Sequence, residues 1–271
     1  MIRFLVLISY FGLTLYLHLT GKLNQYINMH YSYLAYISMV LSLILAIVQL
    51  YLWFKKVKTH SHLATPLANV SSIALLSLPL IIGLTFPTVS LDSQTVSAKG
   101  YHFPLSDGTN LAIQASEGTK SQYLKPDTSS YFSKSAYEKE MRATADKYLA
   151  QDTILITDEN YMEVMEAIYD YPNEFDGRTI QFTGFVYKDP IHDNSQFLFR
   201  FGIIHCIADS GVYGLLTKGN TRQYENNTWI TAKGKLVNYY HKELKQKLPT
   251  LEVESFTKVD KPENPYVYRA F

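Results

Sequence analysis

Three side chains that can bind metals or act as nucleophiles lie close together between Arg200 and Gly214. They are His205, Cys206 and Asp209, and Cys206 is the single cysteine of the 271-residue chain. A borderline-soft cation such as zinc accepts imidazole, thiolate and carboxylate ligands. These three residues are therefore the candidate metal site, with zinc as the candidate cofactor. Two further histidines in predicted loops are candidates for a fourth ligand, namely His192 and His241.

The surrounding sequence limits how this cluster can be arranged. Apolar, β-prone neighbours predict one long strand over residues 196–208. Adjacent side chains on a strand point to opposite faces, so His205 and Asp209 share a face and Cys206 joins them only through a bulge or turn. The alternative is a structural reading in which Cys206 packs as a small hydrophobic residue beside a surface histidine and a turn aspartate.

Enzyme chemistry finds no support in the sequence. The chain has no Ser/His/Asp order, no Gly-rich phosphate loop and no HExxH motif. A nucleophile pair of Cys206 and His205 fails because neighbouring side chains on a strand diverge. We therefore expect a protein that is not an enzyme.

The first third of the chain is far more apolar than the mean hydropathy of −0.07 suggests, because that value averages it with a polar remainder. Three apolar runs predict transmembrane helices over residues 4–20, 33–54 and 70–88, within a membrane region of residues 1–91. The second run carries no charged residue, and the third contains Pro79 and Gly83, which membrane helices tolerate. These features predict a multi-pass protein of the cell membrane, in contact with the lipid bilayer.

Basic residues beside the apolar runs predict the orientation. Lys55, Lys56 and Lys58 lie between the second and third runs, and Arg3 precedes the first. The positive-inside rule places these residues and the N-terminus in the cytoplasm. An odd number of spans then places the C-terminal domain on the side of the membrane opposite the cytoplasm, so residues 152–271 are expected to be extracytoplasmic.

The polar remainder of the chain divides into a linker and a β-rich domain. Residues 92–151 are expected to be a linker with one helix, over residues 136–151. A short strand at 153–156 and a helix from Tyr161 to Pro172 come next, and the carboxylates of this helix, Glu163, Glu166 and Asp170, are expected on its solvated face. Five strands are expected after the helix, at 179–188, 196–208, 212–217, 229–237 and 251–259. Five strands with a preceding helix predict a small barrel of the OB type.

The C-terminal tail reads as an extended segment restricted by proline. Pro262 and Pro265 precede Tyr266 and Tyr268. Such a segment either packs along the barrel or docks on a partner, and Tyr266 and Tyr268 are the candidate partner-binding residues.

Several segments make this chain resemble the bacterial YcgQ-like family. They are 166–177 with EAIY, Pro172 and Gly177; 181–187, QFTGFVY; Arg200-Phe201 with Cys206-Ile-Ala-Asp209 and Gly214; and the tail PYVY at 265–268. The three-span N-terminus with Pro79 is similar too. The family signature has two adjacent cysteines where this chain has His205 and Cys206, and its His-rich loop shrinks here to His60 and His62.

The resemblance implies an accessory subunit of a membrane permease of the YcgR type, with a link to metal-ion, notably zinc, homeostasis. Two functions are therefore open: a permease subunit whose outer domain binds a ligand or partner, and a membrane-anchored interaction module without a small-ligand site. A net charge of +1 and a pI near 7.8 do not indicate a basic groove of the kind that binds nucleic acid. We expect no nucleic-acid partner.

Overall fold

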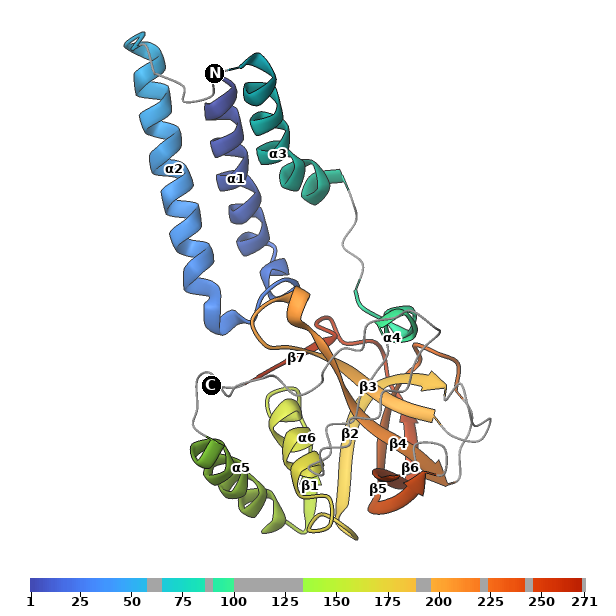
Figure 1. The fold of residues 1–271 in the computed structure, drawn as a ribbon. Coiled ribbons are helices and arrows are strands. Elements are labelled where there is room, and N and C mark those ends of the chain that lie inside the picture. Colours follow the sequence, from blue (N-terminus) through green and yellow to red (C-terminus); the bar gives the residue numbers. More distant parts are fainter. Residues whose placement is uncertain are drawn as a thin grey trace. The chain divides into compact units, whose positions relative to one another are not determined.

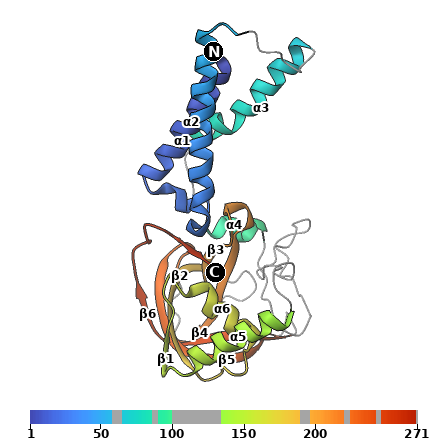
Figure 2. The ribbon, with the colours of Figure 1, turned by 90° about the vertical axis from the view of Figure 1, so that its left-hand side faces the viewer.

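A computed structural model describes residues 1–57, 65–85, 90–99, 134–188, 196–219, 224–241 and 246–269. The chain divides into two compact units, Met1–Val89 and Ser90–Phe271. Figure 1 and Figure 2 show helices in the first unit and a β-rich second unit with helices around it. Residues 100–133, most of the expected linker, lie outside the described residues.

The described part of the first unit contains three helices long and apolar enough to cross a membrane. They are α1 (Ile2–Leu19), α2 (Ser32–Phe54) and α3 (Pro66–Thr85), with short 3-10 turns at Lys22–Gln25 and Met29–Tyr31 between α1 and α2. The prediction of three spans is confirmed. The third helix begins four residues before the predicted residue 70, because the Thr65 hydroxyl accepts a hydrogen bond from the Ala68 amide (3.2 Å) and proline fits the first helical position.

Helix α1 contacts both of the other spans in this unit. The Tyr10 hydroxyl of α1 donates a hydrogen bond to the Leu76 carbonyl of α3 (2.8 Å), three residues before Pro79. Among the described residues of the first unit, the buried apolar ones are Leu23, Ala46 and Leu80. Most large apolar side chains of the spans are about half exposed. Apolar helix surfaces of this kind are typical of segments surrounded by lipid.

The described residues of the second unit form three α-helices: α4 (Ser93–Lys99), α5 (Lys134–Leu149) and α6 (Tyr161–Asp170). Helix α5 packs on α6 and buries Met141, Ala145 and Tyr148. The compact unit therefore begins at Ser90 and includes helices from the region expected to be a linker.

Seven strands form the sheet of the second unit. They are β1 (Thr153–Leu155), β2 (Thr179–Lys188), β3 (Gln196–Ile203), β4 (Gly211–Gly219), β5 (Trp229–His241), β6 (Gln246–Lys258) and β7 (Tyr266–Tyr268). The mostly-β fold with a preceding helix is confirmed, and β2 has the predicted bounds. Strand β3 ends five residues earlier than predicted, at Ile203, because the chain turns into a 3-10 helix at Ile207–Asp209.

Strand pairing joins five of these strands in a ring. Strand β2 pairs with β3, β3 with β4, β4 with β6, β6 with β5, and β5 again with β2. The β4–β6 pair is parallel and the other four pairs are antiparallel. This is the order of a small OB-type barrel. The short strands β1 and β7 add to it in parallel, on β2 and β3 respectively.

Helix α6 is buried on nearly all sides rather than on one. Eight of its ten residues are buried, and Glu166 is among them at 5% exposure. The prediction that Glu166 lies on a solvated face is wrong, because the tail covers that side and Arg269 Nη2 lies 3.5 Å from Glu166 Oε2. A carboxylate enclosed in this way needs a cationic partner.

The two faces of the barrel wall carry different side chains. On the inner face, Val186 lies opposite Leu198, and Gly202 approaches Met162 of α6 so closely that a Cβ there would lie 2.7 Å from its sulfur. The outer face carries Phe185 and Tyr187 of β2 opposite Phe199 and Phe197 of β3. Both faces of β3 are buried along its whole length.

Candidate functional site

The structure brings two of the three predicted ligand residues together, by a turn rather than by strand alternation. His205 Nδ1 lies 2.7 Å from Asp209 Oδ2, and the same carboxylate accepts hydrogen bonds from the amides of His205 (3.1 Å) and Cys206 (3.0 Å). Asp209 closes the turn that follows β3 in this way. Its carboxylate holds the imidazole and the backbone at once.

Cys206 precedes the 3-10 helix and has an extended backbone. Its side chain is half-buried, whereas that of His205 is 52% exposed. Within the described ranges, no group of three or more histidine, cysteine, aspartate or glutamate side chains is arranged to hold a metal ion. His192 and the side chain of His241, the candidates for a fourth ligand, lie outside the described residues.

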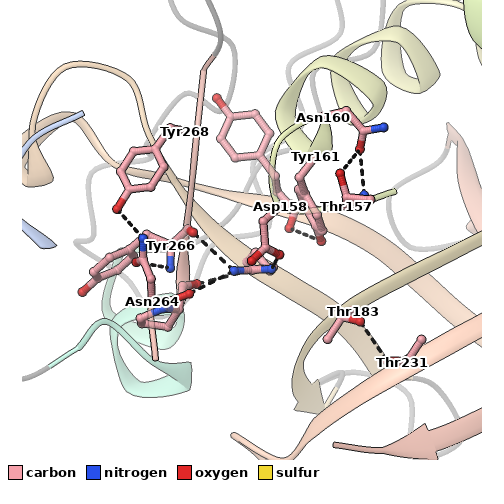
Figure 3. A network of polar contacts seen from close by, with 12 residues as sticks. Thr157, Asp158, Asn160, Tyr161, Thr183, Thr231, Asn264, Tyr266 and Tyr268 are labelled. Atoms are coloured by element: carbon pink, nitrogen blue, oxygen red, sulfur yellow. Dashed lines mark hydrogen bonds and ion pairs between the residues drawn. The ribbon is translucent and has the colours of Figure 1, made fainter. Parts of the chain in front are cut away.

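A second polar cluster surrounds Arg200, whose side chain is 1% exposed. The guanidinium contacts the Asp158 carboxylate and donates to the backbone carbonyls of Pro265 (3.4 Å), Asn264 (3.3 Å) and Tyr266 (3.2 Å). Figure 3 shows the labelled tail residues Asn264 and Tyr266 on one side of this network and Asp158 on the other. Arg200 thus fixes the tail to the loop before α6.

Aromatic rings complete the surroundings of the guanidinium. The Arg200 Cζ lies 5.8 Å from the ring centre of Tyr161 and 5.4 Å from that of Trp229. Cation–π contacts of this kind stabilise a buried cation whose hydration has been lost. Burial, with smaller contributions from neighbouring charges, holds the pKa of the Tyr161 hydroxyl well above its usual value, so the ring stays neutral beside the guanidinium.

The two tyrosines predicted to bind a partner lie in the protein's own sheet. Strand β7 pairs with β3, placing Tyr266 beside Phe201 and Tyr268 beside Ile203. Tyr266 is 4% exposed and its hydroxyl accepts a hydrogen bond from the Leu91 amide (3.1 Å). Tyr268 is half-buried, its hydroxyl accepts from Asn264 Nδ2 (2.8 Å), and burial raises its pKa. Of the two arrangements left open for the tail, the structure has the one in which it packs along the barrel.

Sequence reasoning missed Asp158, Asn264 and Arg269, whose partners lie far away in the chain. One signal was available: Arg200 is a lone charge inside the apolar run QFLFRFGII. A charge in a buried strand requires compensating partners. The identity of those partners depends on which loops the fold brings to the strand.

The two clusters differ in the chemistry that they permit. The Arg200 cluster is enclosed and holds segments of the chain together. The pair of His205 and Asp209 lies at an exposed turn, where an imidazole held by a carboxylate can bind a cation or a partner's polar group.

Comparison with known proteins identifies the family. Models of the DUF1980 N-terminal domain and the DUF1980 C-terminal domain match residues 2–102 and 131–269. The chain is 60% identical, over the full length of both proteins, to a protein of Streptococcus mutans named "Putative two-component membrane permease complex subunit". It is 38% identical, again over the full length of both, to UPF0703 protein YcgQ of Bacillus subtilis. The chain therefore belongs to the DUF1980 family, and the predicted resemblance to YcgQ is confirmed.

Proposed function

We propose that this protein is a non-enzymatic accessory subunit of a membrane permease. The observation that carries the proposal is its 60% identity, over the whole of both chains, to the relative named as a permease complex subunit. The three candidate spans support it, because they expose most of their apolar surface and can accept helices of a partner. The YcgQ-like resemblance points to a YcgR-type permease as this partner.

The test is co-purification of the chain with that permease. Both proteins are expressed together, with an affinity tag on the N-terminus of this chain, because Val267 and Tyr266 near the C-terminus are buried. We expect the permease to elute in a fixed ratio with the chain, and an unrelated multi-span protein expressed at the same level to be washed away. Loss of the permease while the chain stays folded would contradict the proposal.

We further propose that the N-terminus is cytoplasmic and that the β domain is extracytoplasmic. The lysines that follow α2 support this orientation through the positive-inside rule. The test uses a Cys206→Ser background with single cysteines at Lys55 and Ala98, both exposed. We expect a membrane-impermeant maleimide to label Ala98→Cys in intact cells and to label Lys55→Cys only after lysis. The reverse pattern would invert the topology.

A metal-ion role of the His205 turn is our third proposal. The hydrogen bond between His205 Nδ1 and Asp209 Oδ2 supports it, because metal-binding histidines are commonly held by a carboxylate on the ring nitrogen that faces away from the metal. In this arrangement His205 and Cys206 would be direct ligands, Asp209 would orient the imidazole, and further ligands would come from elsewhere. Zinc is the expected cation.

Metal content of the full-length protein tests the proposed metal-ion role. The chain is purified without chelator, and its zinc content is compared with that of a His205→Ala/Cys206→Ser variant. A Lys258→Ala variant, altered on β6 and away from the turn, is the control. We expect stoichiometric zinc in the unaltered chain and in the control, and loss in the double variant. Equal zinc in all three would contradict the assignment of the site to this turn, and no zinc in any would leave the interaction module without a small-ligand site as the description of the β domain.

A further inference from the structure

The outer face of the barrel carries an aromatic surface that is buried, although outward-facing residues of a small barrel are ordinarily solvated. We define the aromatic face as Phe185, Tyr187, Phe197, Phe199, Phe201 and Trp229, each at most 7% exposed. The rings of Phe197 and Phe199 stack with centres 5.2 Å apart, and those of Phe185 and Phe201 with centres 5.7 Å apart. In OB-type barrels, the face of the second and third barrel strands binds ligands, and Phe197, Phe199 and Phe201 lie on the second barrel strand, β3.

A segment of the chain itself contacts this face. We call residues 90–98 the strap; it contains most of α4 and is joined to α3 through residues 86–89. The Ser97 hydroxyl donates to the Tyr187 hydroxyl (3.3 Å), and the Ser93 amide donates to Asn227 Oδ1 (2.8 Å), two residues before Trp229. In both Figure 1 and Figure 2, α4 lies near β3.

The attachment of the strap is weak compared with that of a barrel strand. Val96 is its one fully buried apolar side chain, and Leu91 is only partly buried. Tyr266 and Lys261 of the tail add one side-chain hydrogen bond each, to Leu91 and Ser90. Helix α4 has seven residues, and a helix this short is unstable unless packing holds it. By contrast, β3 is paired with β2, β4 and β7.

From these observations we propose that the strap is a reversible cover of the aromatic face. The strap contacts the face through Ser97 and Tyr187, with Val96 in the same buried apolar cluster, and it can leave the face while the barrel stays folded.

Cysteine labelling of the full chain measures the opening directly. In a Cys206→Ser background, single cysteines replace Val96, which is fully buried in the strap, Ala98, which is exposed in the same helix, and Ile180, which is fully buried in β2. Under native conditions the Ala98→Cys variant gives the labelling rate of an open strap. The Ile180→Cys variant gives the rate set by unfolding of the barrel.

We expect Val96→Cys to react much more slowly than Ala98→Cys and many-fold faster than Ile180→Cys. Equal rates for Val96→Cys and Ile180→Cys would overturn the proposal, because the strap would then open only when the barrel unfolds. Equal rates for Val96→Cys and Ala98→Cys would also overturn it, since the strap would then not cover the face.

Tryptophan quenching tests whether opening exposes the aromatic face. The chain has two tryptophans, so Trp53→Phe leaves Trp229 as the single reporter. Val96→Asp should raise acrylamide quenching of Trp229 severalfold with the β-sheet circular dichroism retained. The matched Ala98→Asp variant adds the same charge at an exposed position and should leave quenching unchanged. Unchanged quenching in Val96→Asp, or loss of the sheet, would contradict the proposal.

Discussion

The Tyr169 hydroxyl of α6 makes two hydrogen bonds to one residue of β4, donating to the Gly214 carbonyl (2.6 Å) and accepting from the Gly214 amide (2.8 Å). A side chain thus takes the place of a strand partner at this point of the barrel. Tyr161, two turns earlier on the same helix, donates to the Tyr213 carbonyl (3.4 Å). These contacts fix the helix in the end of the barrel.

Replacing Tyr169 with phenylalanine should therefore destabilise the β domain by about 2–4 kcal/mol, because it leaves a buried amide and a buried carbonyl without this partner. The measurement is denaturant unfolding followed by Trp229 fluorescence in the Trp53→Phe background. Tyr240→Phe, at a tyrosine that is 52% exposed, is the control and should change the unfolding free energy by less than about 0.5 kcal/mol. Equal effects of the two variants would show that the Tyr169 hydroxyl contributes nothing specific.

Gly214 itself should tolerate no side chain. A Cβ there would lie 1.9 Å from the Leu198 carbonyl oxygen, so the β3–β4 ladder would have to open. We expect Gly214→Ala to cost about 3 kcal/mol or more, at or above the upper end of the range for overpacked cores. Gly177→Ala, at φ +75° with no atom within 4 Å of the added Cβ, tests backbone strain alone and should cost about 1–2 kcal/mol. A cost for Gly214→Ala no larger than that for Gly177→Ala would contradict the steric explanation.

Arg200 should hold the C-terminal tail in place. Its hydrogen bonds to the tail carbonyls should contribute more to this docking than its ion pair with Asp158. Arg200→Met removes the donor to three tail carbonyls. We expect carboxypeptidase to shorten the tail of this variant at least tenfold faster than that of the unaltered chain. A tenfold change corresponds to about 1.4 kcal/mol in the equilibrium between the docked and the free tail. Asp158→Asn changes a side chain that is 64% exposed, so it should weaken docking of the tail by about 1 kcal/mol or less. The readout is mass spectrometry of the C-terminus over time. Full protection of the tail in Arg200→Met would show that strand pairing alone holds β7.

Stability of the β domain should fall at alkaline pH. Burial is the largest cause that raises the pKa values of Tyr161, Tyr169 and Tyr268 above 10, the value expected in the unfolded chain. Above pH 10 the unfolded chain therefore loses these protons while the folded domain keeps them, so the stabilising effect present below pH 10 is lost as pH rises through the folded pKa values.

The measurement is the denaturation midpoint between pH 8 and 12, with phenolate absorbance recorded in parallel. We expect the decline with pH to be less steep in Tyr169→Phe than in the unaltered chain, and Tyr240→Phe to follow the unaltered chain. Identical slopes in all three proteins would contradict the assignment of this loss to buried tyrosines.

Local sequence periodicity was sufficient to locate most elements. Strand β2 has the predicted bounds because polar and apolar side chains alternate from Thr179 to Thr183 and β-prone residues follow from Phe185 to Tyr187. Strand β3 was predicted too long, since Ile203 to Ala208 is as apolar as a strand. The turn that ends it depends on the Asp209 carboxylate reaching the amides of His205 and Cys206, which no pattern of hydrophobicity records.

The sequence by itself determined the three membrane spans, the β-rich C-terminal domain and its family, because hydropathy and strand alternation are properties of neighbouring residues. Tertiary structure decided which residues meet: Glu166 with Arg269, Arg200 with Asp158 and the tail, and the strap with Tyr187. The first two of these place a charged group in a buried site, where its partner is supplied by a segment distant in the chain. Such pairings depend on chain topology. The sequence shows a charged residue within an apolar segment, but it does not show which distant segment supplies the partner of that charge.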